Sequence, residues 1–207
     1  FSGDLNDRLK TMAMASGIYL HATQWKSYIN NVADNPGSFT ALITERLRSV
    51  KAVLVAFTPN RNDTTIRSFG RLSQNVTSMS LKIGHELYPY FPVSGNGADE
   101  KSNCEYICEM YKALGQFGAT QTIGVIDGVN FAKADASVYN AVGRSIYAMD
   151  IEAFSKQPLE SGVNLYLLNG MSVNFTFGAG CIASNVTTFV LHDCIYALKP
   201  DGSFSCS

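Results

Sequence analysis

The hydrophobic pattern is strongest in residues 49–57, a nearly uninterrupted apolar run that is rich in valine. Such a run is typical of a strand that is covered on both faces. Residues 75–83 instead alternate, which predicts a strand with one buried face. The positions expected on that buried face are Thr77, Met79, Leu81 and Ile83. Both patterns indicate a β-rich chain.

Further strands are predicted at residues 145–154, 163–176 and 187–197. The turns between strands have a physical cause, since proline fixes φ and glycine accepts positive φ. Two such turns are Asn35-Pro36-Gly37 and Pro200-Asp201-Gly202. Long apolar strands joined by polar turns favour two packed sheets. We therefore predict an all-β fold, a β-sandwich.

Residues 1–20 fit two interpretations. Asp4 is placed to cap a short helix, whereas Ile18-Tyr19-Leu20 is typical of extended chain. We predict a lead-in segment or a first strand here. No internal repeat or low-complexity linker divides the chain, so residues 1–207 are expected to form a single domain.

One inserted amphipathic helix is predicted at about residues 103–114. Ser102 and Glu105 have the spacing of a capping box, and Gly115 stands at the C-terminal cap position. The apolar side chains at helical spacing are Cys104, Ile107, Cys108, Tyr111 and Leu114. We expect this helix to pack against the sandwich and residues 116–144 to form a long excursion between strands.

The segment 88–93 is extended, aromatic and marked by Pro89 and Pro92. Because proline cannot donate to a central ladder, we expect this segment at a sheet edge or outside the sheet. Its aromatic rings could stack on sugars or bases, but packing in a core or an interface is the more common role.

The composition narrows the class of protein. Of the 207 residues, 46% are hydrophobic and only 16% are charged, against about 25% charged in ordinary soluble proteins. The fold is therefore either unusually compact or covered by copies of itself or by partners. A formal net charge of −1 and the lack of long basic runs argue against nucleic-acid binding through a positive patch. No apolar run approaches the ~20 residues of a membrane span.

The five cysteines are too few and too scattered for a disulfide scaffold, so buried free thiols in a reducing compartment are expected. Cys104 and Cys108 share a helix face, but a structural zinc needs four ligands. We predict no metal site and no cofactor. The first residue is Phe and no signal peptide is present, which suggests a fragment, a processed form or the ordered part of something longer.

The candidates for catalysis are weak, and no catalytic residue is predicted. His192 and Asp193 lack the Gly-x-Ser-x-Gly elbow of a nucleophile triad, and we expect a polar pair where a strand reaches the sheet edge. Asp150 and Glu152 alternate on a strand, roughly 7 Å apart, a separation that a glycosidase pair could use. A charged pair on an exposed strand face is the more common arrangement. We therefore expect a protein that is not an enzyme.

The order and spacing of several segments resemble one family, although no single motif is diagnostic. In chain order they are Trp25-Lys26-Ser27-Tyr28, residues 49–57, Leu81-Lys82-Ile83-Gly84, Leu87-Tyr88-Pro89, the helix at 103–114, Asp150-Ile151-Glu152, Ser161-Gly162-Val163-Asn164, Phe189-Val190-Leu191-His192-Asp193 and the hairpin at Asp201-Gly202. From about residue 20 onward, the chain resembles the C-terminal half of the double jelly-roll major capsid proteins of Polinton-like viruses, virophages and their large DNA virus relatives.

The resemblance implies a jelly-roll sandwich and a coat protein of an icosahedral virion, assembled in a reducing compartment of the host cell. In that family, three subunits with two jelly rolls each form a pseudo-hexagonal capsomer. The implied partners are the protein itself as a homotrimer, neighbouring capsomers, and penton or minor capsid proteins. The chain holds one roll, so either an N-terminal roll lies outside it or it is a related single-roll protein.

Under this interpretation we expect Tyr88, Tyr90 and Phe91 to be intersubunit anchors, because aromatic side chains dominate interface energetics. Tyr106 and Tyr111 of the helix are further candidates. Two alternatives remain: a trimeric jelly-roll module that binds a receptor or glycan, and a carbohydrate-active enzyme that uses Asp150 and Glu152.

Overall fold

The computed structural model describes residues 2–59, 71–95, 100–115, 126, 131, 145–152, 161–166, 168 and 170–206. In chain order the elements are α1 (Ser2–Ser16), β1 (Ile18–Val32), β2 (Ser38–Ile43), β3 (Val50–Pro59), β4 (Val76–Ile83), β5 (Glu86–Ser94), the 3₁₀-helix η1 (Glu100–Asn103), α2 (Cys104–Ala113), β6 (Tyr147–Asp150), β7 (Met171–Phe177), β8 (Ser184–Leu198) and β9 (Phe204–Cys206).

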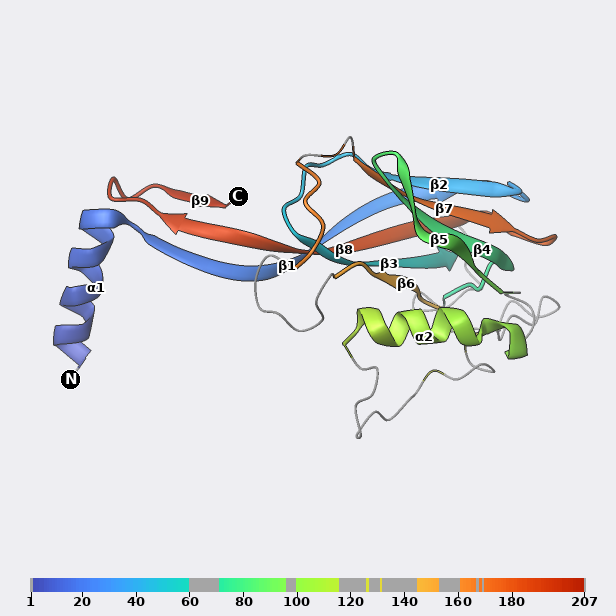
Figure 1. Ribbon diagram of the computed structural model, residues 1–207, viewed down its shortest axis with the longest axis horizontal. Helices are drawn as coiled ribbons and strands as arrows, with labels where there is room; N and C mark the ends of the chain where they lie inside the picture. The colour runs from blue at the N-terminus through green and yellow to red at the C-terminus, as the bar shows by residue number, and fades with distance from the viewer. Residues whose placement is uncertain are drawn as a thin grey trace.

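Strands β1 to β8 form two antiparallel sheets, in the orders β1-β8-β3-β6 and β2-β7-β4-β5. The first strand pairs with the eighth, the second with the seventh, the third with the sixth and the fourth with the fifth. This pattern arises when a long antiparallel hairpin, folded between β4 and β5, wraps around itself as a jelly roll. Figure 1 shows the two sheets stacked on each other. The predicted jelly-roll sandwich is confirmed.

Strand β3 is covered on both faces, as its apolar run predicts. It lies between β8 and β6, and every residue from Val50 to Phe57 is buried. Val53, Val55 and Phe57 face the core between the sheets, whereas Ala52 and Leu54 belong to a second apolar cluster outside the first sheet. The alternating pattern of residues 75–83 is confirmed at Met79 and Leu81 of β4, which are fully buried, but not at Thr77, because the register shifts there and Val76 is buried instead.

Helix α2 covers the outer face of the first sheet, alongside β6 (Figure 1). Its Met110 and Ala113 pack in the second cluster with Ala52, Leu54 and Ala148. The predicted helix is therefore confirmed. It ends as expected, because Gly115 adopts a φ of 66° and donates to the carbonyl of Lys112.

The predicted start of the helix is wrong by one residue. Asn103, the last residue of η1, occupies the N-cap position instead of Ser102, and its side chain makes no capping hydrogen bond. Glu105 does not complete a capping box. Instead its carboxylate accepts a hydrogen bond of 3.1 Å from the backbone N–H of Ser94, which ties the helix to β5.

Other expectations also need correction. The lead-in segment or first strand expected at residues 1–20 is extended only from Ile18 onward, since residues 2–16 form the helix α1. The strand expected at 163–176 is shorter, because β7 begins at Met171 and Val163 makes only an isolated bridge to Val50. The excursion at 116–144 lies outside the described residues, apart from Ile126 and Phe131. The single domain stays a prediction.

Candidate assembly surface

Strand β5 is an edge strand of the second sheet, as its two prolines predict. Its pairing with β4 is interrupted: Val93 lies opposite Met79, and Tyr88 lies opposite Leu81. Residues 89–92 therefore face the single residue Ser80 and bulge out of the ladder. Prolines and bulges block pairing with a further strand. A partner at this edge must accordingly bind side chains rather than backbone.

The bulge presents two large aromatic side chains to solvent. Tyr90 is 83% exposed and Phe91 is 77% exposed. Their rings contact each other edge to face, with centroids 5.0 Å apart. This arrangement holds the two rings as one apolar knob, the kind of anchor that inserts into a pocket of a partner.

The other predicted anchors lie differently. Tyr88 is less exposed, and its hydroxyl donates to the backbone carbonyl of Asp150, at 3.3 Å. Burial, followed by the nearby carboxylates of Glu109 and Asp150, raises the pKa of Tyr88. Tyr111 is half-buried and donates to the carbonyl of Ile126. Both side chains are held against the body of the protein, with part of each ring accessible.

Tyr106 is fully buried within the chain, so its side chain is not accessible to a partner subunit and it is not an interface residue. Its ring packs against Tyr147 and Phe131 in the core, with centroids 5.1 and 6.2 Å away. The helix turns residues 106, 110 and 113 toward the sandwich, and it leaves Cys104 and Cys108 exposed. All five cysteines are free, as expected, but only Cys181 and Cys194 are buried.

A second apolar surface lies on an arm that the sequence analysis does not identify. Strand β3 pairs with β8 only as far as His192, and beyond it β8 continues as a ribbon with β1 and β9. Figure 1 shows this ribbon leaving the sandwich, with α1 at its far end. Tyr19 and Leu20 point to opposite faces of the ribbon, and both are more than half exposed. Phe204 of β9 is exposed as well.

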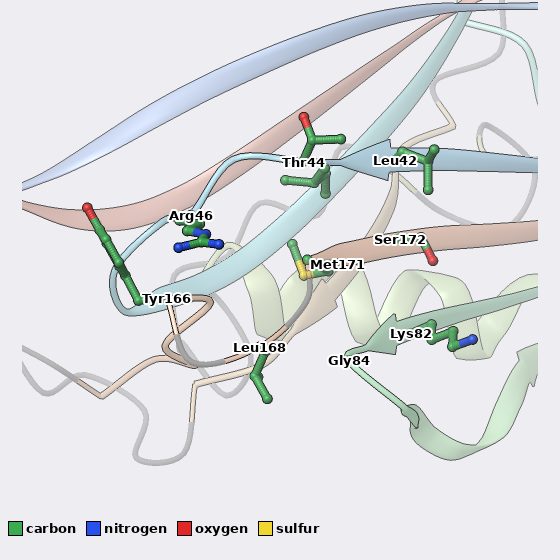
Figure 2. Close-up of a pocket in the computed structure, with 11 residues that line it drawn as sticks. Leu42, Thr44, Arg46, Lys82, Gly84, Tyr166, Leu168, Met171 and Ser172 are labelled. Atoms are coloured by element: carbon green, nitrogen blue, oxygen red, sulfur yellow. The ribbon is translucent and has the colours of Figure 1, made fainter.

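A hollow of about 540 Å³ lies where β2 and β4 end and β7 begins. Figure 2 shows its side chains, which come from these strand ends, from residues 44 and 46, and from residues 166 and 168. The lining includes the cations Arg46 and Lys82 and the side chains of Tyr166 and Leu168, with Arg46 on the side of Tyr166 and Lys82 on the opposite side (Figure 2). The hollow offers positive charge and an aromatic surface.

The structure places the two candidate catalytic pairs differently from the expectation. Asp193 is buried on β8, which lies between β1 and β3 and is not an edge strand as expected, and it forms an ion pair with Lys51. Glu152 follows β6 and lies near the same lysine, so Asp150 and Glu152 are not an exposed strand pair. Instead, the backbone N–H of Glu152 donates to the Asp150 carboxylate.

Among the described residues, no group of three or more His, Cys, Asp or Glu side chains is arranged to hold a metal ion. No helix in the described part of the chain has the length and apolarity needed to cross a membrane.

Neither a family model nor a curated protein sequence matches this chain. Solved structures do match in fold. A chain from a quasi-atomic model of the PBCV-1 virus capsid gives a TM-score of 0.56 at 7% identity, over 98% of this chain and 54% of that chain. PBCV-1 VP54, fitted into a cryo-EM reconstruction of the virophage Sputnik, gives a TM-score of 0.52 at 8% identity, over 97% of this chain and 54% of that chain. The Faustovirus major capsid protein gives a TM-score of 0.52 at 7% identity, over 93% of this chain and 35% of that chain.

The resemblance is thus confirmed at the level of fold. The chain spans about half the length of the PBCV-1 chains that it matches and about a third of the Faustovirus protein. It has the jelly-roll fold that these viral capsid structures contain.

Proposed function

We infer that this chain is a jelly-roll unit of a viral capsid shell, located in the virion, and that it acts by assembling with copies of itself. The observation that carries this proposal is the fold, which matches capsid structures over nearly the whole chain. A shell protein works by presenting complementary surfaces that closed symmetry repeats.

The finer proposal is a trimeric, pseudo-hexagonal capsomer in which Tyr90 and Phe91 are intersubunit anchors, supported by Tyr88 and Tyr111. The knob of Tyr90 and Phe91 supports this assignment because two large rings are held in water on a bulge that cannot pair with a strand. The apolar arm supports self-association as well, since an isolated ribbon with both faces apolar is only marginally stable in water. Neighbouring capsomers and penton or minor capsid proteins would be further partners.

The test compares the native protein with the Tyr90→Ala/Phe91→Ala variant by light scattering and negative-stain imaging. We expect native trimers with a hexagonal outline, and folded monomers for the variant, with an unchanged thermal unfolding midpoint. Tyr166→Ala is the matched control, because it also removes an exposed ring but lies at the hollow. Retention of trimers by the double variant would refute the anchors, and a native monomer would refute the capsid assignment.

The hollow favours a second candidate function, a jelly-roll module that binds a receptor or glycan. Tyr166 provides an aromatic face of the kind that stacks on sugars, beside the Arg46 side chain. A glycan array would detect this activity, and Tyr166→Ala would abolish it while leaving assembly intact. If the protein bound no glycan on the array and the native protein were trimeric, the binding role would be refuted and only the capsid role would remain.

A further inference from the structure

Three ionisable side chains from different parts of the chain meet at one end of the first sheet. The Nζ of Lys51 lies 2.9 Å from Oδ1 of Asp193 and 3.8 Å from Oε1 of Glu152. Their side chains are only 9%, 7% and 13% exposed, in the order Lys51, Asp193, Glu152. We call these three residues the Lys51 cluster. Neither the proposed capsid role nor the proposed binding role requires it.

The jelly-roll topology produces this cluster. Strand β3 is paired with β8 on one side and with β6 on the other, and β3 has a bulge at Lys51. Backbone bonds fix both neighbours, because Ile151 donates to the carbonyl of Lys51 and Asp193 donates to that of Ser49. The paired strands β3 and β8 therefore hold Lys51 and Asp193 in place, and the backbone bond of Ile151 to Lys51 holds the start of the segment that carries Glu152.

We propose that Lys51 and Asp193 react to form an intramolecular isopeptide bond, and that Glu152 carries the protons for this reaction. The Nζ of Lys51 gives a proton to the Glu152 carboxylate and attacks Cγ of Asp193. A C–N bond forms, and the C–O bond to one Asp193 oxygen breaks. Glu152 delivers two protons, one after the other, from the nitrogen to that oxygen, which leaves as water. The products are an amide and one water molecule, so no oxidant or other co-reactant is needed.

Position and burial both favour the reaction. Reacting groups held about 3–3.5 Å apart gain the rate advantage of an intramolecular step. The amide product removes two charges from a site with little access to water.

Two hydroxyl groups are placed to stabilise the intermediate. The Ser49 hydroxyl donates to Oδ2 of Asp193 at 2.7 Å, and the Thr23 hydroxyl donates to Oδ1 at 3.3 Å. The oxygen that stays on Cγ gains negative charge when the nitrogen adds, so the hydroxyl that donates to that oxygen would act as an oxyanion hole. Ser49 is itself held by the backbone N–H of Gly162. Ser161 donates to the Glu152 carboxylate and orients it.

The test is the intact mass of the purified full chain, measured after complete denaturation. We expect a mass lower by one water molecule than the sequence requires. Trypsin should leave the chain uncut after Lys51 and should release a branched species that contains residues 51 and 193. An unchanged mass after prolonged incubation of the folded protein at neutral pH would overturn the proposal, as would a loss of water confined to one unbranched peptide.

Variants separate the roles of the three groups. Lys51→Met and Asp193→Ala should have the full mass their sequences require. Because either could fail to fold, Glu152→Gln provides an independent measurement, since it keeps the size of the side chain and removes the base. We expect it to slow bond formation by about 10²-fold or more, as loss of a general acid–base does. An unchanged rate in this variant would overturn the assignment of Glu152.

Discussion

The hydroxyl of Tyr147 donates a hydrogen bond of 2.5 Å to the backbone carbonyl of Ser73, and both residues are almost completely buried. This bond links β6 of the first sheet to the segment that leads into β4 of the second. Removing the hydroxyl would leave the carbonyl with only the longer bond of 3.3 Å from the backbone N–H of Val76, at a cost of about 0.5–1.5 kcal/mol. We therefore expect Tyr147→Phe to lower the free energy of unfolding by that amount, measured by urea denaturation.

Tyr196→Phe is the control for this variant. The Tyr196 hydroxyl also makes a hydrogen bond, to the Gln24 side chain at 3.3 Å, but in contact with solvent. Water can replace that partner, so the loss should stay within about 0.5 kcal/mol. Equal losses in the two variants would show that burial of the Ser73 carbonyl does not determine the cost.

Gly162 lies so close to β3 that no side chain fits there. A Cβ at this position would be 2.4 Å from the carbonyl oxygen of Val50, because Val163 and Val50 exchange two backbone hydrogen bonds of 2.8 Å. Gly162→Ala must displace the backbone, and we expect a loss of about 1–3 kcal/mol. Gly180→Ala is the control, because the added carbon there meets open space and only the strain of a positive φ remains. We expect this strain to cost about 1 kcal/mol. A smaller loss for Gly162→Ala than for this control would contradict the close approach.

The five thiols should fall into two classes of reactivity. Cys104, Cys108 and Cys206 are exposed, whereas Cys181 and Cys194 are buried. Burial raises the pKa of Cys181 to about 11 and also raises that of Cys194. Because the thiolate is the reactive form, we expect a thiol reagent at neutral pH to modify three cysteines quickly and two only after unfolding. Five equally fast thiols would show that the buried pair is accessible.

Most strands of the fold are predictable because their signals are local. The apolar run of β3 and the alternation of β4 report burial directly, and the turn at Asp201-Gly202 marks the hairpin between β8 and β9. Helix α2 shows the limit of such patterns. Two different sets of apolar residues satisfy a helical period. One set is at positions 104, 107, 108 and 111, and the other is at positions 106, 110 and 113. Only the packing on β3 and β6 decides that Tyr106 is buried and Cys104 is exposed.

The candidate sites depend on pairing between distant strands, which a single sequence does not show. Lys51 looks like a lone polar interruption of an apolar strand until β3 is placed between β8 and β6. The exposed knob at Tyr90 and Phe91 follows from the slip in register between β4 and β5. The arm is missed for a similar reason, because only the end of the β3–β8 pairing shows that Tyr19 and Leu20 lie beyond the sandwich.

The charge on Asp150 should reduce stability at neutral pH. Burial is the largest influence and raises its pKa, the carboxylates of Glu152 and Glu109 act in the same direction, and the hydrogen bond from the Glu152 backbone opposes them. The folded state therefore holds the Asp150 proton more tightly than the unfolded state does. The corresponding stabilisation is complete below the unfolded pKa, about 3.9, and is lost as the pH rises through the folded pKa.

Asp150→Asn keeps an oxygen that can accept the Glu152 N–H and removes the charge. We expect it to be more stable than the native protein at pH 7, with a difference that shrinks as the pH falls to 3, measured by urea denaturation at each pH. Asp201→Asn is the control of opposite sign, because hydrogen bonds from Ser203 lower the pKa of Asp201. Asp201 thus stabilises the fold above its unfolded pKa, so its variant should be less stable at pH 7 and equal to the native protein at low pH. A difference for Asp150→Asn that does not change with pH would assign its effect to packing rather than to charge.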